Sequence, residues 1–369
     1  MTSVTAGSLD GPSILPCSVG PSTLDSVPTV YELTREQLAE RLAVWGEPAF
    51  RATQVWSQLW TRGATYDRMS EVSPALRERL AAELPIGVEI LDERTADHGA
   101  TRKAVLKLGG QHLIETVLMG YPDRVTVCVS SQAGCAMGCG FCATGQMGLQ
   151  NNLTAGEIVA QVLWAKREAA NLPDTTPRRL TNVVFMGMGE PMANERHVFR
   201  SLDLLTGPAG IGARHLTVST VGVIPGIERL ADRAPQVGLA VSLHAATDEL
   251  RDELVPPNRR YPLAKLEAAI AGWRAKTRRR PSIEWAMIAE TNDSDEQARA
   301  LAPIAKRLGA HVNLIPLNPT PGWPAKPSSQ RRIHGFVRVL QAVGVNVTVR
   351  DTRGRRIDAA CGQLRLEHA

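Results

Sequence analysis

The stretch GCAMGCGFCATG, residues 134–145, holds three of the chain's six cysteines, Cys135, Cys139 and Cys142, in a C-x-x-x-C-x-x-C spacing. Three thiolates this close together suit a cubane iron–sulfur cluster. The same stretch is rich in glycine, which lets the backbone curl tightly around a bulky inorganic group. The loop therefore predicts a [4Fe–4S] cluster with three protein ligands and one open iron.

A structural zinc site is the alternative interpretation of these thiols. Such a site usually has four ligands in two separated pairs, and the sequence contains no second C-x-x-C pair and no H-x-x-x-H pair. The other cysteines, Cys17, Cys128 and Cys361, are scattered and do not indicate a disulfide framework. The ligand count therefore favours the cluster.

The bulk composition limits the fold class and the location of the protein. A chain of 369 residues with 43% hydrophobic and 21% charged residues is typical of a globular protein, and it accommodates an α/β barrel with a smaller appended domain. It has no export leader and no run of 18 apolar residues, so we expect a cytoplasmic enzyme without membrane contact. A net charge of +5 is compatible with a nucleic-acid partner.

The N-terminal part of the chain divides into a tail and a helical domain. Residues 1–30 are rich in Ser, Thr, Gly and Pro, and we expect a disordered tail there. Residues 31–85 predict a helical accessory domain for RNA docking, because Thr34 and Gln37 form a capping-box pattern and Ser73-Pro74 starts a later helix. Its tryptophans lie at helical spacing, so packing in the core is favoured over stacking on bases: Trp45, Trp56 and Trp60.

The rest of the chain predicts an α/β fold. Residues 86–123 contain short β-like runs and predict a small β subdomain that leads into a barrel over residues 124–369. In that region apolar strands alternate with helices, which indicates a parallel sheet and favours a partial (β/α) barrel. The strands are expected at 182–188, 215–220, 237–243, 283–288, 311–317 and 345–350, with helices near 156–170, 195–207, 262–276, 294–308 and 329–343.

Four motifs in order carry a resemblance to a known family: 129-VSSQAGCAMGCGFCATGQMG-148, 185-FMGMGEP-191, 242-SLHAATDELRDELVP-256 and 358-DAACGQL-364. Together they resemble the radical S-adenosylmethionine (SAM) dual-specificity 23S rRNA/tRNA adenosine-C2 methyltransferases. The resemblance implies a barrel of radical SAM type, with a [4Fe–4S] cluster on Cys135, Cys139 and Cys142 whose open iron binds SAM. It also implies 23S rRNA and tRNA as substrates, an electron donor such as flavodoxin or ferredoxin, and a monomeric enzyme.

The same resemblance implies a catalytic set of three residues. Cys361 accepts a methyl group from one SAM, and the radical formed from a second SAM removes hydrogen from that methyl group. Carbon 2 of adenine is electron-poor, which makes a radical route intelligible. Cys128 then forms a transient disulfide with Cys361 and releases the product, and Glu115 takes the proton from carbon 2.

SAM contacts are implied in the same way. Gly189 and Glu190 are assigned to the amino-acid moiety, Asn318 to the nucleoside end, and four further residues to the ribose and carboxylate surroundings: Ser219, Ser242, Leu243 and His244. All lie at or just beyond predicted strand ends, where a barrel places its active site.

RNA contacts are expected from two basic clusters, although charged runs are usually solvated faces. The first is Arg278, Arg279 and Arg280, and the second is Arg350, Arg353, Arg355 and Arg356. The family often has acidic residues where this chain has Arg355-Arg356, so substrate contacts there are expected to differ.

Without the resemblance, the catalytic residues have ordinary interpretations. Cys128 fits a small core residue, Glu115 the solvated face of an edge strand, and His244 a structural histidine. Two other functions stay open at this point. One is the related methyltransferase of the antibiotic-resistance type that modifies carbon 8 of adenosine, and the other is a non-catalytic iron–sulfur RNA-binding regulator.

Overall fold

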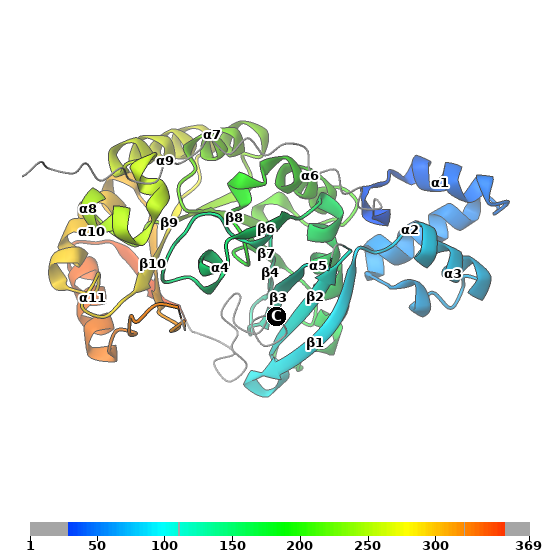
Figure 1. Ribbon diagram of the computed structural model, residues 1–369, viewed down its shortest axis with the longest axis horizontal. Coiled ribbons are helices and arrows are strands. Elements are labelled where there is room, and N and C mark those ends of the chain that lie inside the picture. The colour runs from blue at the N-terminus through cyan, green and yellow to red at the C-terminus, as the bar shows by residue number, and fades with distance from the viewer. Residues whose placement is uncertain (1–28, 110, 321, 351–369) are drawn as a thin grey trace, which may run out of the picture.

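The computed structural model describes residues 29–109, 111–320 and 322–350. These ranges form a small helical lobe beside a large α/β body (Figure 1). No helix within them is long and apolar enough to cross a membrane. Of the expected N-terminal tail, only residues 29 and 30 are described, so Cys17 lies outside the described residues. The segment with Cys361 lies outside them as well.

Local capping explains where the first and third helices of the lobe begin. The lobe contains α1 (Arg35–Val44), α2 (Phe50–Arg62) and α3 (Pro74–Glu83). Thr34 Oγ1 accepts a bond from Gln37 N, and Gln37 Oε1 accepts one from Thr34 N, so the capping box is confirmed. Ser73 caps α3 with Pro74 in its first turn, as expected.

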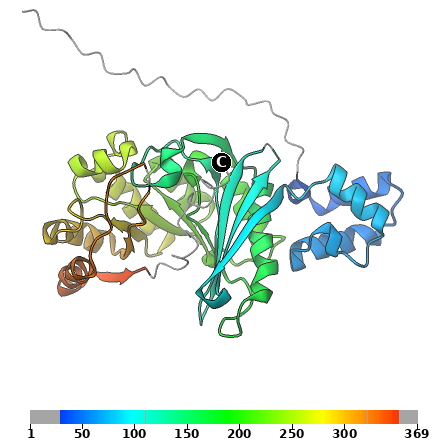
Figure 2. The same cartoon turned by 60° about the horizontal axis from the view of Figure 1, so that its bottom comes forward.

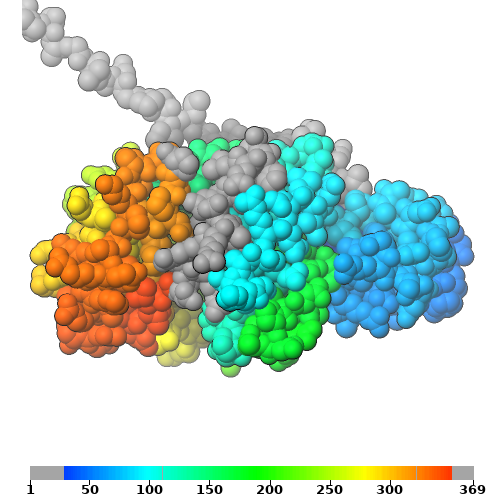
Figure 3. Space-filling model, turned by 90° about the horizontal axis from the view of Figure 1, so that it is seen from below, coloured from blue at the N-terminus to red at the C-terminus, as the bar shows by residue number. Residues whose placement is uncertain are grey.

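The lobe packs on α5 (Ala155–Glu168), the first long helix of the body. Trp60 is buried there, with the ring of Tyr31 edge-on at 5.4 Å, and Trp45 and Trp56 pack against the same core. Core packing of the three tryptophans is thus confirmed. Lys166 Nζ donates to Trp60 O at 2.9 Å and ties α5 to the lobe. Seen from below, the lobe protrudes beyond the cyan strands (Figure 3).

One sheet organises the body. Within the described residues it has ten strands in the order β1-β2-β3-β4-β7-β8-β9-β10-β11-β12. From β4 onward neighbouring strands are parallel, and the order is linear, so the sheet is a partial barrel. These strands are β4 (Val125–Cys128), β7 (Asn182–Phe185), β8 (Leu216–Thr220), β9 (Gly238–Ser242), β10 (Ser282–Met287), β11 (His311–Pro316) and β12 (Asn346–Val349). The α/β fold with a partial barrel is therefore confirmed.

The small β subdomain expected over 86–123 consists of three strands in the structure. Its strands are β1 (Val88–Ala96), β2 (Thr101–Leu108) and β3 (Leu113–Gly120), and they form an antiparallel meander. β3 pairs antiparallel with β4, so the meander extends the barrel sheet (Figure 2). The backbone pairing that joins this meander to β4 is long-range, so no local sequence pattern predicts it.

Helices cover the outer face of the parallel strands (Figure 1). Ile283, Trp285 and Met287 of β10 pack in the main core, whereas Ala286 faces a cavity inside the barrel. The covering helices are α6 (Glu195–Thr206), α7 (Ile224–Arg233), α9 (Leu263–Thr277), α10 (Asp295–Leu308) and α11 (Gln330–Ala342). This alternation leaves the inner face free to build a site.

Shorter elements surround the inner face of the barrel. A second sheet pairs β5 (Gln132–Gly134) with β6 (Leu149–Asn152), and α4 (Ala143–Gln146) and α8 (Asp248–Leu254) are short helices. The 3₁₀ turns are η1 (Val30–Glu32), η2 (Tyr66–Arg68), η3 (Asp97–Gly99), η4 (Ala169–Asn171), η5 (Pro191–Ala193), η6 (Ala213–His215) and η7 (Pro256–Arg259).

Candidate active site at the strand ends

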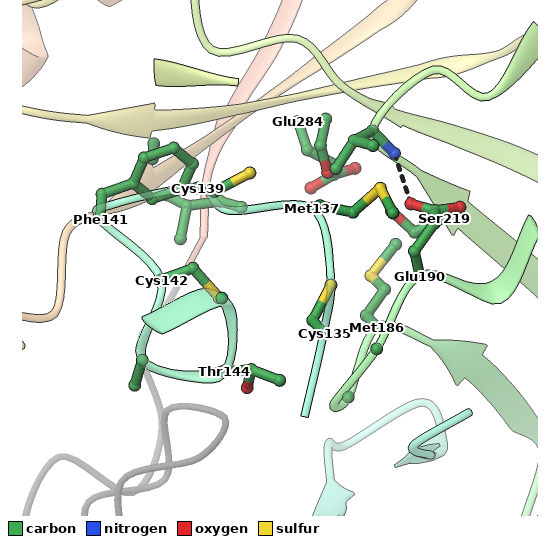
Figure 4. A pocket seen from close by; sticks show the side chains of 18 of the residues that line it. Cys135, Met137, Cys139, Phe141, Cys142, Thr144, Met186, Glu190, Ser219 and Glu284 are labelled. Carbon is green, nitrogen blue, oxygen red and sulfur yellow. Dashed lines mark hydrogen bonds between the residues drawn. The ribbon is translucent and has the colours of Figure 1, made fainter. Parts of the chain in front are cut away.

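A cavity of about 330 Å³ opens at the carboxyl ends of the parallel strands. Its wall combines the cysteine loop with residues that end or follow β4, β7, β8, β9 and β11. This is the edge where a barrel places its active site. Figure 4 shows side chains from the cysteine loop, from the loop after β7, and from β8 and β10 around the same space.

The β5–β6 pair holds the cysteine loop at both ends. Gly134 has a φ of +76°, and a Cβ at this position would overlap the carbonyl oxygen of Gly148, the residue just before β6, so a glycine is required. Cys135 N donates to the same carbonyl at 2.9 Å, and Cys142 N donates to Cys139 O at 3.1 Å. The loop therefore returns on itself with its three cysteines in the cavity wall.

The surroundings of the thiols suit a cluster better than a single metal ion. Burial raises the pKa of the Cys135 thiol to about 12 and raises that of Cys139 as well, so a bound metal would have to stabilise the thiolates. In the described ranges no three His, Cys, Asp or Glu side chains converge tightly enough to hold one ion. A [4Fe–4S] cluster needs no such convergence, because each thiolate binds a different iron.

Glu190 is the buried acid of the site. Its Oε1 accepts from Met192 N at 3.0 Å and its Oε2 from Val221 N at 2.8 Å, and burial raises its pKa to about 7. Gly189 has a φ of +99°, and a Cβ there would collide with Gln132, which accepts from Glu190 N at 2.8 Å. The loop after β7 is thus fixed with a carboxyl group in the cavity.

Most of the expected SAM residues come together in this wall. Ser219, Ser242, His244 and Asn318 line the cavity, together with Gly189 and Glu190. Leu243 differs, because its side chain is buried in the main core and its backbone N–H donates to Glu284 O at 3.0 Å. Only the backbone of Leu243 is placed to contribute to the site.

His244 has a fixed ring and a strained backbone. Its φ of +61° is rare for a residue other than glycine. Nδ1 accepts from Ala286 N at 3.0 Å, which assigns the ring proton to Nε2. Burial lowers the pKa of His244 to about 3, so the ring is neutral near pH 7 and offers a hydrogen-bond donor. Phe141 meets the ring edge-on at 4.9 Å.

Arg251 is a buried residue that the sequence analysis missed. Its Nε donates to Leu243 O at 3.0 Å, and its Nη2 donates to the carbonyls of Val221 and Ser242. The guanidinium therefore joins the ends of β8 and β9, and Val221 in turn donates to Glu190. In sequence Arg251 belongs to a charged helical run that is typical of a solvated face, so only the long-range contacts identify it.

The catalytic residues implied by the resemblance occupy different positions. Cys128 lines the cavity and is buried, so it is both the small buried residue of the ordinary interpretation and a member of the site. Glu115 does not lie on a solvated edge strand, because β3 lies between β2 and β4. It is buried, with Oε2 at 3.0 Å from Lys103 Nζ, and is set back from the described lining. Cys361 lies outside the described residues.

The basic clusters also lie in different places. Arg350 lines the cavity, whereas Arg278 and Arg280 are exposed after α9 and Arg279 donates to Gln236 O. Arg353, Arg355 and Arg356 lie beyond the described residues. Their contacts with RNA stay a prediction.

Two family models match the chain. The Radical SAM superfamily model matches residues 129–299, which include the cysteine loop and the strands β7 to β10. The model of the Ribosomal RNA large subunit methyltransferase N-terminal domain matches residues 29–86, which form the helical lobe.

Similar proteins span almost the whole chain. The Probable dual-specificity RNA methyltransferase RlmN of Chloroflexus aurantiacus is 48% identical, covering 92% of this chain and 93% of that protein. The Dual-specificity RNA methyltransferase RlmN 1 of Myxococcus xanthus is 44% identical, covering 92% and 95%. The crystal structure of a radical SAM methyltransferase from Sphaerobacter thermophilus is similar with a TM-score of 0.84 and 48% identity, covering 91% of this chain and 98% of that one.

Proposed function

Since the chain belongs to the RlmN family of dual-specificity RNA methyltransferases, we propose that it methylates carbon 2 of adenosine in 23S ribosomal RNA and in transfer RNA. The observation that carries the proposal most is the position of Cys128. A fourth thiol shares the cavity with the three cysteines of the loop. Reductive cleavage of SAM needs only the loop, so an additional thiol in the wall points to covalent catalysis.

The loop cysteines and Glu190 are the residues that would hold the cofactors. Cys135, Cys139 and Cys142 would bind the cluster, and the buried carboxyl group of Glu190 would receive the amino group of SAM. When bound, the cluster and SAM together supply an electron transfer that yields a 5′-deoxyadenosyl radical. Ser219, Ser242, His244 and Asn318 would orient SAM from the neighbouring strand ends.

The remaining roles belong to the chain's own thiols and to Glu115. Cys361 is proposed to carry a methyl group from a first SAM. The radical chemistry that a second SAM would supply removes one hydrogen atom from this methyl group, so that its carbon can add to carbon 2. Glu115 accepts the carbon-2 proton. Val117 lies opposite Cys128 in the β3–β4 register and lines the cavity, and Glu115 lies on the same face of β3 two residues away. Lys103 fixes its carboxylate.

Product release is the role proposed for Cys128. Its sulfur bonds to the sulfur of Cys361 as the bond between that sulfur and the methylene carbon on the base breaks. The carbon takes up a proton to become the methyl group, and the single electron left over from the radical addition would return to the cluster. A thiol reductant then reduces the disulfide and restores both thiols. Access to the cavity supports this role, because a thiol that exchanges in this way has to meet its partner.

Analysis of modified RNA tests the proposal. Purified, cluster-reconstituted enzyme is incubated with SAM, a reductant and RNA, and nucleosides from the digested RNA are separated by mass spectrometry. We expect 2-methyladenosine in both 23S rRNA and tRNA. Exclusive formation of 8-methyladenosine would show that the enzyme is of the antibiotic-resistance type. The absence of 5′-deoxyadenosine with RNA present would favour the iron–sulfur regulator.

A further inference from the structure

A second carboxylate, that of Glu284 on β10, lies in the wall of the same cavity, and none of the roles above uses it. Its side chain is 4% exposed, and Figure 4 shows it among the lining residues. A carboxylate removed this far from water needs strong hydrogen bonds or a ligand. A buried acid in a cavity of this kind is a candidate for function.

Two neutral donors fix the Glu284 carboxylate. Ser282 Oγ donates to Oε1 at 2.7 Å, and Asn313 Nδ2 donates to Oε2 at 2.7 Å. Asn313 lies opposite Glu284 in the β10–β11 register, so the strand pairing sets this contact. Each carboxylate oxygen can accept a second bond, and the side chain thus offers two neighbouring acceptors in a fixed orientation.

The strand order indicates which part of a ligand Glu284 meets. Glu190, proposed for the methionine end of SAM, lies in the loop after β7, and Asn318, proposed for the nucleoside end, follows β11. β10 lies between these strands, next to β9. A SAM molecule that extends along the strand ends therefore brings its ribose toward β9 and β10.

We infer that Glu284 binds the 2′- and 3′-hydroxyl groups of the SAM ribose. A ribose presents two adjacent O–H donors, which match the two acceptor positions of the carboxylate that the described residues leave open. Acidic side chains recognise ribose hydroxyls in the same way in dinucleotide-binding folds. The inference rests on one part of the proposed function, which is that SAM binds in this cavity.

The first test changes the ligand and leaves the protein intact. Equilibrium dialysis of the cluster-reconstituted wild-type chain compares SAM with an analogue that lacks the 2′- and 3′-hydroxyl groups. Loss of hydrogen bonds to a charged group is expected to weaken binding about 10- to 100-fold. Equal affinity for SAM and the analogue overturns the inference, and a wild-type chain that binds no SAM contradicts the proposed function as well.

The second test changes the residue. Glu284→Gln keeps the size of the side chain but loses its charge, and it is expected to bind SAM about tenfold or more weakly while no longer favouring SAM over the analogue. Glu284→Asp, which keeps the charge, should recover part of the affinity. Glu228→Gln makes the same charge change at an exposed position on α7 and should bind SAM as the wild type does.

Binding of RNA by Glu284→Gln distinguishes a role toward SAM from a role toward RNA. If Glu284→Gln binds SAM normally but binds RNA more weakly, Glu284 belongs to the RNA site and the inference is wrong. Visible absorbance of the cluster and circular dichroism show whether each variant is assembled. If Glu284→Gln fails to assemble, Glu284→Asp replaces it in the comparison of the two ligands, and a preference for SAM over the analogue equal to that of the wild type overturns the inference.

Discussion

At the scale of single residues, Cys128 is set apart from the loop cysteines by its position at the end of β4. It faces the cavity from the sheet, whereas Cys135, Cys139 and Cys142 face it from the loop. The thiol proposed to resolve the covalent link is therefore held on a rigid strand, which suits a residue that acts on a passing intermediate.

Replacement of this thiol is expected to trap the intermediate. In Cys128→Ala the bond between Cys361 and the methylated base has no thiol to break it, so a covalent protein–RNA adduct should accumulate. Release of 2-methyladenosine should fall by about a hundredfold or more, as is typical when a covalent participant is removed. A denaturing gel with labelled RNA detects the adduct.

The control is Cys17→Ala, which removes a cysteine without an assigned role and should give no adduct. Free 2-methyladenosine produced by Cys128→Ala at the wild-type rate would exclude the disulfide step.

Sequence reasoning at this scale finds residues of the cavity wall where spacing or a motif carries the signal. The spacing of the three loop cysteines singles them out, and the apolar run before Gly189-Glu190 predicts a loop at a strand end, although only the resemblance assigns these two residues to SAM. Arg251 and Glu284 were missed, because a buried arginine and a buried glutamate look like solvated residues until their long-range partners are known. Leu243 was assigned to the site, but its side chain belongs to the core.

At the scale of elements, the junction between η1 and α5 depends on a glycine. Gly156 lies in the first turn of α5, and a Cβ at this position would overlap Thr29 Oγ1. Thr29 is itself held by a bond from its N–H to Glu32 Oε2 at 3.1 Å. The close approach of these two segments therefore requires a residue without a side chain.

Gly156→Ala is expected to loosen the lobe. Overpacking at a tight contact should lower the free energy of unfolding by about 1–3 kcal/mol. Hydrogen exchange should increase in α1 and α2, because α2 packs on α5. Denaturant titration and exchange measured by mass spectrometry check the two effects.

Gly272 provides a matched control in a helix. It lies in α9, where a Cβ added to this residue would have no neighbouring atom within 4 Å, so Gly272→Ala should be neutral or more stable by up to about 1 kcal/mol. If both variants behave alike, the contact with Thr29 does not determine how the lobe docks.

Most elements of the fold were predictable because their signals are local. Two local signals identify helices to within one or two residues: the caps at Thr34 and Ser73, and the helical spacing of apolar residues in the α/β region. For example, α10 spans 295–308, and the expected range was 294–308. The β5–β6 pair was missed, because its strands are short and hold no apolar alternation. The pairing of β3 with β4 was missed for a different reason, because which strands pair is not a local property of the sequence.

At the scale of the whole molecule, buried acids make stability depend on pH. Burial raises the pKa of Glu157 to about 7 and that of Glu190 to about 7, from an ordinary value of 4.5. Between these values the folded protein holds protons that the unfolded chain has released, so stability falls as the pH rises. His244 acts oppositely, because its lowered pKa of about 3 makes stability rise with pH up to its ordinary value of 6.5.

Glu157→Gln isolates one of these contributions. The amide keeps an oxygen to accept the bond from Thr154 N, but it has no charge to bury. Relative to the wild type, its free energy of unfolding should increase by up to about 3 kcal/mol between pH 5 and pH 8. Denaturant titrations across this range measure the difference.

Glu78→Gln, at an exposed position on α3, is the control and should follow the wild-type curve. Parallel curves for Glu157→Gln and the wild type would contradict the prediction.

The open sheet has a consequence for how the molecule meets copies of itself. Within the described residues β1 is an edge strand, and an edge exposes unpaired backbone groups to any passing strand. Ile90 and Leu91 are exposed there, but the register shifts between Ile90 and Asp92, and charged Glu89 and Asp92 flank the apolar pair. The bulge and the two acids therefore disfavour aggregation of one sheet edge with another. An open sheet needs such features in its edge strand, because a closed barrel has no edge to protect.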